Sequence, residues 1–300
     1  MIRASVVIPA FNAGEFLAAS VRSMLDQSLR DIEVLLIDDG STDGSASSFS
    51  ATCADPRLRY FRRENQGLAS TLNFGISKSR SEIIIRMDAD DIAEPDRVEK
   101  QVAYLEARPD IVLLGGQISR VVDGNEVSTS GFPTSHGEIL RGLLRGEHVI
   151  CHPSIAFRRS AAMKVGCYWG LGVSEDWDFY LKLAEVGRVA NLDSQILRYR
   201  FHGSGINAQS MQEVRRNIRL AVINHRNRVA GAPEWTVSDY QARASFRDKL
   251  QVAAESNSLR LYRRSLQNRA QGRKVCSSLQ LLTAGALWPA QAARRIVGRV

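Results

Sequence analysis

Cysteine is scarce in this sequence, and its spacing is irregular. The four cysteines, at positions 53, 151, 167 and 276, form no CxxC pair and no regular series. Disulfide frameworks and zinc sites both depend on regularly spaced cysteines, so we expect neither. The pattern predicts reduced thiols in a cytoplasmic protein.

Long apolar runs are also absent. No run of about 18 or more apolar residues occurs, so we predict no membrane-spanning helix. The N-terminal stretch MIRASVVIPAFN leads directly into a strand-like run, which predicts that no secretory signal is present. Residues 279–300 begin with 15 uncharged residues, fewer than the ~20 that a span requires. That segment could lie in a membrane interface, although a helix packed on the domain is the more common structure.

Acidic residues are few in the last third of the chain. Residues 205–300 contain 17 Lys and Arg against 5 Asp and Glu, whereas the formal net charge of the whole chain is +8. Residues 1–204 are therefore net acidic. The basic region could face anionic lipid, nucleic acid or an acidic partner, or form a solvated helical surface. Its cations are not interleaved with aromatic residues, so we expect no nucleic-acid binding.

Apolar runs and helical periods alternate along the first 110 residues. The run SVVIPAF (5–11) is typical of a parallel strand buried on both faces, and residues 14–27 repeat apolar side chains at helical spacing. The alternation continues with a strand and turn at 32–45, a strand, loop and helix at 58–76, a strand at 82–88 and a helix at 94–110 with Pro95 in its first turn. This order predicts crossover connections and a parallel sheet.

The pattern changes after residue 110. We predict a strand pair turning at 123–125, a strand at 148–159, a helix at 174–187 and a strand at 188–202. Because no break in composition divides residues 1–204, we predict one α/β domain there, with halves at 1–110 and 111–204. Residues 205–300 are predicted to form a helical, basic extension.

Polar side chains follow the predicted strands at their carboxyl ends, where ligands of such sheets bind. They are Asn12, Asp38, Asp39, Asn65, Asp88, Asp90 and Asp91. Paired carboxylates after a buried strand predict a site for a hard divalent cation, Mg²⁺ or Mn²⁺, which takes oxygen ligands together with substrate phosphates. On an extended chain Asp88 and Asp90 point to the same side. Asp91 is expected to point elsewhere and to bond the following turn.

Eight blocks of the sequence resemble, in order, those of the family 2 glycosyltransferases. The first four are similar to the family's nucleotide-sugar-binding blocks: SVVIPAFNAGEFLAASVRSMLDQS, DIEVLLIDDGSTDGS, ENQGLASTLNFGI and MDADDIAEPDRV. The other four are similar to its acceptor-side blocks: CHPSIAFRRS, GCYWG, SEDWDFYLKLAEVG and LRYRFH. The resemblance covers about residues 4–204. It implies the GT-A fold, a Rossmann-like, mostly parallel mixed sheet flanked by helices, and inverting transfer from a nucleotide-diphosphate sugar, usually a UDP-sugar.

The resemblance also implies roles on the donor side. The implied donor-nucleotide residues are Pro9, Ala10, Phe11, Asn12, Glu15, Asp39, Gly67, Asp88, Ala89 and Asp90. Asp39 would accept a hydrogen bond from the base, whereas Asp38 would cap the turn. Asp90 is the implied metal ligand, Asp88 would contact the ribose or a metal-bound water, and His202 is a further candidate ligand.

On the acceptor side, Asp176 matches the family's general base. One carboxylate suffices, because a diphosphate leaves without a proton. The alternative is that Glu175, Asp176 and Asp178 only form an acidic first helical turn that suits the helix dipole. The candidate acceptor-binding residues are His152, Trp169, Glu175 and Trp177. His152 could hydrogen-bond the acceptor, and the aromatic faces of the two tryptophans could stack on the acceptor or donor sugar. Core packing for Trp177 and a structural role for His152 are open alternatives.

Two other functions are alternatives to glycosyl transfer. A sugar-phosphate nucleotidyltransferase has a similar sheet, but its first strand usually leads into a Gly-rich basic loop, whereas PAFNAGEF contains no Lys or Arg. A non-catalytic nucleotide-sugar-binding scaffold would lack part of the catalytic set, and no part is missing. Arg198 and Arg200 could pair with phosphate or with surface acids. By family habit we expect surface glycan or polysaccharide biosynthesis on a glycan or lipid-linked acceptor, with peripheral contact at the inner face of the cytoplasmic membrane.

Overall fold

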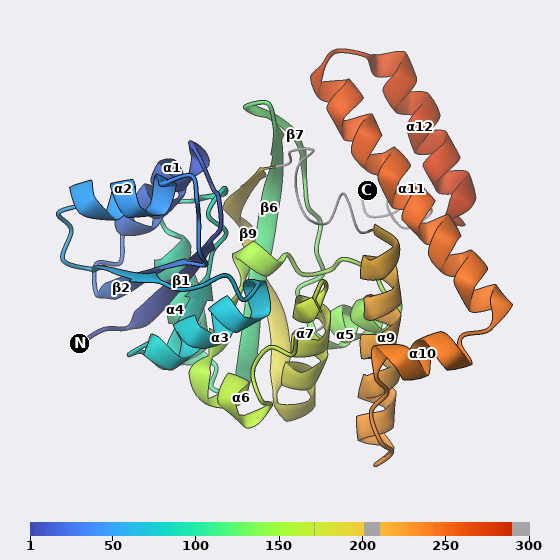
Figure 1. Ribbon diagram of the computed structural model, residues 1–300, viewed down its shortest axis with the longest axis horizontal. Helices are drawn as coiled ribbons and strands as arrows, with labels where there is room; N and C mark the ends of the chain where they lie inside the picture. Colours follow the sequence, from blue (N-terminus) through green and yellow to red (C-terminus); the bar gives the residue numbers. More distant parts are fainter. Residues whose placement is uncertain (171, 201–210, 290–300) are drawn as a thin grey trace.

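A sheet of nine strands forms the centre of the protein (Figure 1). The computed structural model describes residues 1–170, 172–200 and 211–289. Its strands are β1 (Ala4–Ala10), β2 (Ile32–Asp38), β3 (Leu58–Arg62), β4 (Ile83–Arg86), β5 (Ile92–Ala93), β6 (Ile111–Val122), β7 (Asn125–Thr129), β8 (Ala156–Arg158) and β9 (Arg188–Arg200). Their spatial order is β3-β2-β1-β4-β8-β6-β9-β5, and β7 pairs with β6.

Four neighbouring strands at one side of the sheet are parallel. β2 pairs in parallel with β1 and β3, and β1 pairs in parallel with β4. β8 lies antiparallel between β4 and β6, and β6 and β9 are parallel again. The predicted mixed, mostly parallel sheet is therefore confirmed.

Helices cover both faces of this sheet (Figure 1). They are α1 (Phe16–Leu25), α2 (Ser45–Thr52), α3 (Leu68–Lys78), α4 (Arg97–Ala107), α5 (His136–Leu144), α6 (Arg159–Lys164), α7 (Glu175–Val186), α9 (Met211–Val229), α10 (Val237–Arg243), α11 (Phe246–Ala270) and α12 (Lys274–Leu287). Among the described residues, none of these helices combines the length and the apolar composition that crossing a bilayer would require.

The alternation of side chains along β1 explains the two helical layers. Ile8 packs in a cluster with residues of α1, α2 and α4, whereas its neighbour Val7 packs in a second cluster with α3, α5, α6, α7 and α9. Both side chains are buried. Burial of one such side chain contributes about 1.5–3 kcal/mol, so the continuous apolar run stabilises both layers.

A glycine allows α3 to lie close to the sheet. A Cβ atom at Gly75 would overlap Cγ1 of Val7 and would lie 2.8 Å from Cδ1 of Ile37. The close approach sets the position of the whole helix, including its start after Gly67, beside the ends of β1 and β2. This edge of the sheet is where the predicted site residues lie.

The helices after β9 begin as part of the main domain. Val214, Ile218 and Ala221 of α9 are buried in the same cluster as residues of α7. The predicted division at residue 204 lies outside the described residues, which resume at Met211. Farther along, α11 and α12 form an antiparallel hairpin at one side of the molecule (Figure 1).

The predicted strand at 148–159 is wrong over most of its length. His152–Ser154 form a 3-10 turn, and only Ala156–Arg158 form a strand. Pro153 lacks an N–H for a strand ladder, which explains the interruption. Similarly, the helix predicted from residue 94 begins at Arg97, so Pro95 precedes the helix instead of lying in its first turn.

Candidate active site

The carboxyl ends of β1, β2 and β4 meet at one edge of the sheet. The Asp39 N–H donates to the carbonyl of Ala10 at 2.8 Å, which joins the ends of β1 and β2. The Met87 N–H donates to the carbonyl of Val7 at 3.1 Å, which joins β4 to β1. The Ser20 hydroxyl of α1 donates to the carbonyl of Asp88 at 2.7 Å. The structure therefore brings the predicted donor-side segments together.

The two aspartates after β2 have different partners. Asp38 Oδ1 accepts the backbone N–H of Ser41 at 2.7 Å, so Asp38 caps the turn as predicted. Asp39 accepts the backbone N–H groups of Gln66 and Gly67, at 3.1 and 2.9 Å. This carboxylate therefore holds the loop before α3 against the end of β2. Each of its oxygens keeps a second lone pair with which it could accept a nucleotide base.

The other implied donor residues form two groups, one exposed to solvent and one buried. Phe11, Asn12 and Glu15 are exposed at the rim, and Gly67 is exposed with a positive φ of 83°. Pro9, Ala10 and Ala89 are buried, so their side chains form the floor beneath the rim. Asn12 has a φ of 50°, and its side-chain oxygen accepts the Thr42 N–H at 2.9 Å. That bond fixes the turn after β1 against the turn after β2.

Three carboxylates converge after β4, and we call Asp88, Asp90 and Asp91 the acidic triad. One oxygen from each lies within 4.8 Å of the others. The expectation that Asp91 points elsewhere is wrong, because a turn at 89–90 replaces the extended chain that it assumed. Asp91 is fully buried, and its Oδ1 accepts the Arg200 N–H at 2.8 Å. Its Oδ2 is buried with no hydrogen-bond partner among the described residues.

Two buried arginines lie beneath the acidic triad. Arg86 Nη2 forms an ion pair with Asp88 Oδ1 at 2.5 Å, whereas its Nε and Nη1 are buried without partners among the described residues. Burial lowers the pKa of Arg97 to about 9, although Asp91 acts in the opposite direction. Arg97 is fully buried, and its Nη2 donates to the Arg86 carbonyl at 2.7 Å. These cations partly offset the repulsion among three adjacent carboxylates.

The acidic triad has the chemistry of a divalent-cation site. Burial raises the pKa of Asp88, and burial together with Asp88 and Asp90 raises the pKa of Asp91 well above its usual range. The buried, unpartnered Asp91 Oδ2 is an oxygen that lacks a cation or a proton. Carboxylate oxygens are the ligands that Mg²⁺ and Mn²⁺ take. The residues present therefore fit such an ion.

The first turn of α7 carries the predicted base. Burial raises the pKa of Asp176 to about 6, even though the positive charge of Arg86 acts in the opposite direction. Burial and the neighbouring Asp176 raise the pKa of Glu175 to about 8. At neutral pH Asp176 is therefore mostly ionised and able to take a proton, whereas Glu175 is mostly protonated. Arg86 is electrostatically coupled to both Asp88 and Asp176.

His152 lies beside the same turn. Its Nε2 is 2.9 Å from the Tyr168 hydroxyl, and its Nδ1 is 3.7 Å from Glu175 Oε1. Burial and the charge of Arg86 lower the pKa of His152 well below its usual range, so the imidazole is neutral. Trp169, next to Tyr168, is 38% exposed. An aromatic face at this place could pack on a sugar.

Trp177 does not have an exposed ring. It is 1% exposed, and its indole Nε1 donates to the Leu143 carbonyl at 3.1 Å. Its ring also meets His148 edge-on, with centroids 5.1 Å apart. The acceptor-stacking prediction for Trp177 is contradicted, because α7 turns this side chain into the core.

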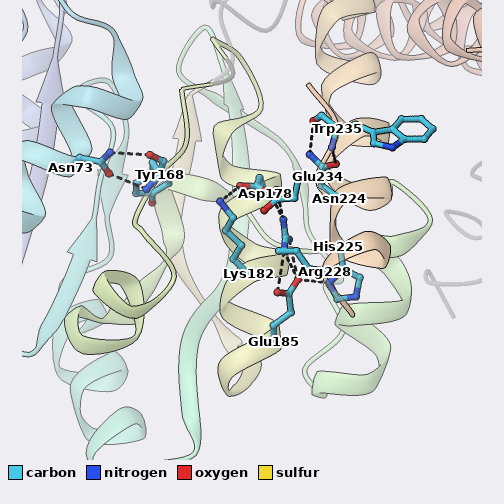
Figure 2. Close-up of polar contacts among 10 residues, drawn as sticks. All are labelled: Asn73, Tyr168, Asp178, Lys182, Glu185, Asn224, His225, Arg228, Glu234 and Trp235. Atoms are coloured by element: carbon cyan, nitrogen blue, oxygen red, sulfur yellow. Dashed lines mark hydrogen bonds and ion pairs between the residues drawn. The ribbon is translucent and has the colours of Figure 1, made fainter. Parts of the chain in front are cut away.

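Asp178 belongs to a separate group of charges between α7 and α9 (Figure 2). We call this group the α7–α9 network: Asp178, Lys182, Glu185, Arg228 and Glu234. Arg228 contacts all three carboxylates at 2.9–3.2 Å, and Lys182 pairs with Asp178 at 2.8 Å. Asp178 is fully buried but has two cationic partners, so its role is to fasten α9 to the domain.

Asn73 connects the donor half to the acceptor half (Figure 2). Its Nδ2 donates to the Tyr168 carbonyl at 2.9 Å, and its Oδ1 accepts the Tyr168 N–H at 3.0 Å. The paired bonds fix the loop that carries Tyr168 and Trp169 relative to α3. From the sequence alone Asn73 is expected only to bond helix backbone; its actual partner, Tyr168, lies 95 residues away.

The remaining candidates lie at the end of β9. Arg198 is exposed and pairs with Glu94 at 2.9 Å, which supports the surface-acid alternative. The guanidinium of Arg200 lies over the Phe16 ring, 4.9 Å from its centroid. His202 lies outside the described residues. Arg86 and Arg97 are the charged residues that sequence reasoning missed; the one signal for Arg86 is a charge inside the apolar run IIIRM.

Comparison with known proteins gives a family. The profile of Glycosyl transferase family 2 matches residues 5–166, more than half of the chain. The amylovoran biosynthesis glycosyltransferase AmsE of Erwinia amylovora is 28% identical over 208 residues, which cover 68% of this chain and 78% of AmsE. The chain spans 32% of the length of chondroitin synthase and 79% of the length of WbnJ, two other relatives from Escherichia coli.

Solved structures share the fold. S. aureus TarS 1–349 in complex with UDP-GlcNAc matches with a TM-score of 0.59 at 15% identity, covering 96% of this chain and 92% of that one. Mannosyltransferase PcManGT from Pyrobaculum calidifontis, in complex with GDP-Man and Mn²⁺, matches with a TM-score of 0.53 at 17% identity, covering 96% and 87%. The predicted GT-A fold is confirmed. With the acidic triad at the carboxyl edge of such a sheet, the profile match shows that this chain belongs to glycosyl transferase family 2.

Proposed function

We propose that this protein transfers a sugar, with inversion, from a UDP-sugar to an acceptor hydroxyl and uses Mg²⁺ or Mn²⁺. One observation carries the proposal. The acidic triad, with its unpartnered buried oxygen, and Asp176, with its pKa near 6, are both electrostatically coupled to Arg86. A cation site and a base poised near neutral pH are the two functions that this reaction needs.

The donor would lie across the ends of β1, β2 and β4. Asp39, held by the amides of Gln66 and Gly67, would accept the base N–H, and the rim residues Phe11 and Asn12 would border the base and ribose. UDP is the family's usual nucleotide, and TarS was solved with UDP-GlcNAc. PcManGT was solved with GDP-Man, so GDP is the competing choice for the nucleotide.

The acidic triad would hold the divalent ion, chiefly through Asp90 and the unpartnered oxygen of Asp91. When bound, the ion neutralises charge that builds on the departing diphosphate. Arg86 and Arg97 keep the three carboxylates together before the donor arrives. Asp88, paired with Arg86, is left to meet the ribose or an ion-bound water.

Asp176 would act as general base. It takes the proton of the acceptor hydroxyl while that oxygen forms a bond to the anomeric carbon and the bond to the diphosphate oxygen breaks. Attack from the side opposite the leaving group inverts the configuration at this carbon. Glu175, protonated and beside neutral His152, can orient acceptor hydroxyls, and Trp169 offers an aromatic face.

Surface polysaccharide is the acceptor class that we propose. AmsE is named for amylovoran biosynthesis, and WbnJ of Escherichia coli, another relative, for O-antigen biosynthesis. The identity of the transferred sugar and the linkage depend on the loops around the site.

A thermal-shift panel tests the donor site. UDP, dTDP, GDP and CDP are each added with and without Mn²⁺. A nucleotide at ~100 times its Kd adds ~2.7 kcal/mol of stability, which raises the melting temperature by roughly 4 °C for a protein of this size. We expect the largest shift with UDP and only in the presence of the ion. A larger shift with GDP would change the donor, and no shift with any nucleotide would contradict the proposal.

A further inference from the structure

The outer helix of the α11–α12 hairpin carries an exposed apolar stripe. Val275, Leu279 and Leu282 are 74%, 60% and 72% exposed. Their spacing of four and three residues places them on one face of α12. The opposite face packs on α11, where Ala284 is buried and its carbonyl accepts the Ser258 hydroxyl at 2.7 Å. The stripe therefore remains exposed to solvent after α12 has packed on α11.

Cations without acidic partners accompany this stripe. From residue 256 to the C-terminus the sequence has nine Lys and Arg and no Asp or Glu. Five of these side chains are exposed and form no ion pair with any described residue: Arg260, Arg264, Arg269, Arg273 and Lys274. The preceding acid, Glu255, is already paired with Arg215 and Arg219. Beyond Glu255 the hairpin thus presents positive charge that no acidic residue of the same segment offsets.

Two of these cations lie where helix electrostatics disfavours them. Arg273 is the N-cap residue of α12 and Lys274 is its first residue, and the first turn contains no acid. The N-terminus of a helix carries a partial positive charge, which favours acidic side chains there. Helix stability therefore does not explain these cations, whereas an external anionic surface would.

We propose that the α11–α12 hairpin, which carries the apolar stripe and the five cations, docks this protein on an anionic lipid surface. Apolar side chains enter the interfacial region while Lys and Arg meet the headgroups, the combination that holds amphipathic helices on membranes. α11 also packs against β6 and β7, and Val121 of β6 pairs with Arg200, whose N–H contacts the acidic triad. Docking of the hairpin would therefore hold the whole domain at the lipid surface, and this consequence rests on the proposed transfer to a lipid-linked acceptor.

Vesicle co-sedimentation of the full chain tests this surface. The probes are vesicles of phosphatidylcholine alone and of equal parts phosphatidylcholine and phosphatidylglycerol. We expect binding to the anionic vesicles only, weakened by high salt because exposed charges are screened. Replacing one cation, for example Arg264→Gln, should weaken binding about fivefold. Equal binding to both vesicles, or no binding to either, would overturn the proposal.

A double substitution in the stripe, Leu279→Asp with Leu282→Asp, should abolish vesicle binding. The matched control is Val229→Asp at the end of α9, because Val229 is also 72% exposed but lies outside the hairpin. The control should bind as the wild type does, and both variants should keep the thermal shift with nucleotide.

Wild-type binding by the double variant would overturn the proposal. So would a dimer that the double substitution converts to monomers in sedimentation velocity, since the face would then contact a second copy. The vesicle assay needs no sugar donor, so its failure would leave the proposed transfer untouched.

Discussion

The acidic triad and the α7–α9 network are both clusters of buried or partly buried charge, but they differ in how their atoms are satisfied. In the α7–α9 network each carboxylate contacts at least one cation within 3.2 Å. In the acidic triad Asp91 has only a backbone N–H on one oxygen and nothing on the other among the described residues. Asp178 Oδ2 also lacks a hydrogen bond, but it lies 2.8 Å from Lys182 Nζ. Burial and charge alone therefore do not mark a functional site; a buried carboxylate oxygen without a cation does.

The position of each cluster in the fold agrees with this difference. The acidic triad lies at the carboxyl edge of parallel strands, where ligands of such sheets bind. The α7–α9 network lies between two helices and joins them (Figure 2). We therefore expect substitutions in the first cluster to change ligand binding and catalysis, and substitutions in the second to change stability.

Removing the base should have the largest effect on activity. Asp176→Asn is expected to lower kcat by about 10²–10⁴-fold, because an amide cannot take the acceptor proton. The Mn²⁺-dependent thermal shift with UDP should persist, since Asp176 is not placed in the donor site. Steady-state kinetics with the donor identified by the panel measures the loss. Activity equal to the wild type would remove Asp176 from the mechanism.

Breaking the α7–α9 network should mainly destabilise the fold. Asp178→Asn leaves Arg228 and Lys182 near a neutral group, and removal of one partner from a buried ion pair costs about 3–5 kcal/mol. Urea denaturation measures this free energy of unfolding. Glu234→Gln is the control, because Glu234 is 38% exposed and its pair should contribute less than about 1 kcal/mol. Equal effects of both substitutions would contradict the structural role of Asp178.

Replacement of an aspartate by asparagine in the acidic triad should instead raise the free energy of unfolding. Folding raises the pKa of Asp91, so its ionised form opposes folding, and this loss of stability grows as the pH rises above the ordinary range for Asp. Asp91→Asn should stabilise the metal-free protein at pH 7 by about 1 kcal/mol, or roughly 2 °C in melting temperature. Thermal melts with EDTA measure the stability of the metal-free variant. Melts with Mn²⁺ measure the stabilisation by the ion, which the variant should lose. Destabilisation of the metal-free variant would show that Asp91 is a structural acid.

The coupling through Arg86 should appear as a small shift in the pH profile. Transfer should rise with pH through about 6 and then level off, because the base must be deprotonated. Arg86 lowers the pKa of Asp176, so Arg86→Met should move this limb to higher pH, whereas Arg86→Lys should keep it near its wild-type position. The profile of kcat/KM measures the limb. If the limb of Arg86→Met stayed at the wild-type pH, Arg86 would have no effect on the pKa of the base.

Much of the donor half could be predicted from local sequence. The run SVVIPA (5–10) is buried on both faces as expected, whereas Phe11 at its end is exposed, and Asp38 caps the turn that its Gly-Ser-Thr-Asp context predicts. These features depend on residues a few positions apart, where periodicity and turn chemistry act directly. The prediction of a strand at 148–159 was wrong. The apolar composition of this segment favoured a strand, but Pro153 lacks the N–H that a strand ladder needs.

The site itself depends on contacts that no local pattern contains. Asp91 joins the acidic triad because a turn replaces the extended chain, and Trp177 enters the core because α7 packs its side chain toward Leu143. Asn73 and Tyr168, which join the two halves, are 95 residues apart. Such placements follow from the packing of whole elements.

The sequence by itself determined the alternation of strands and helices, the edge of the sheet at which ligands bind, and the residue types available there. Side-chain periodicity and chain chirality suffice for these, because they act on neighbouring residues. The tertiary structure decided which charges remain unsatisfied. Burial beside Arg86 and Arg97 makes the acidic triad a site for a cation, and ion pairing with α9 makes Asp178 a structural residue. The free energy of a carboxylate depends on its surroundings within a few ångströms, and only folding assembles those surroundings.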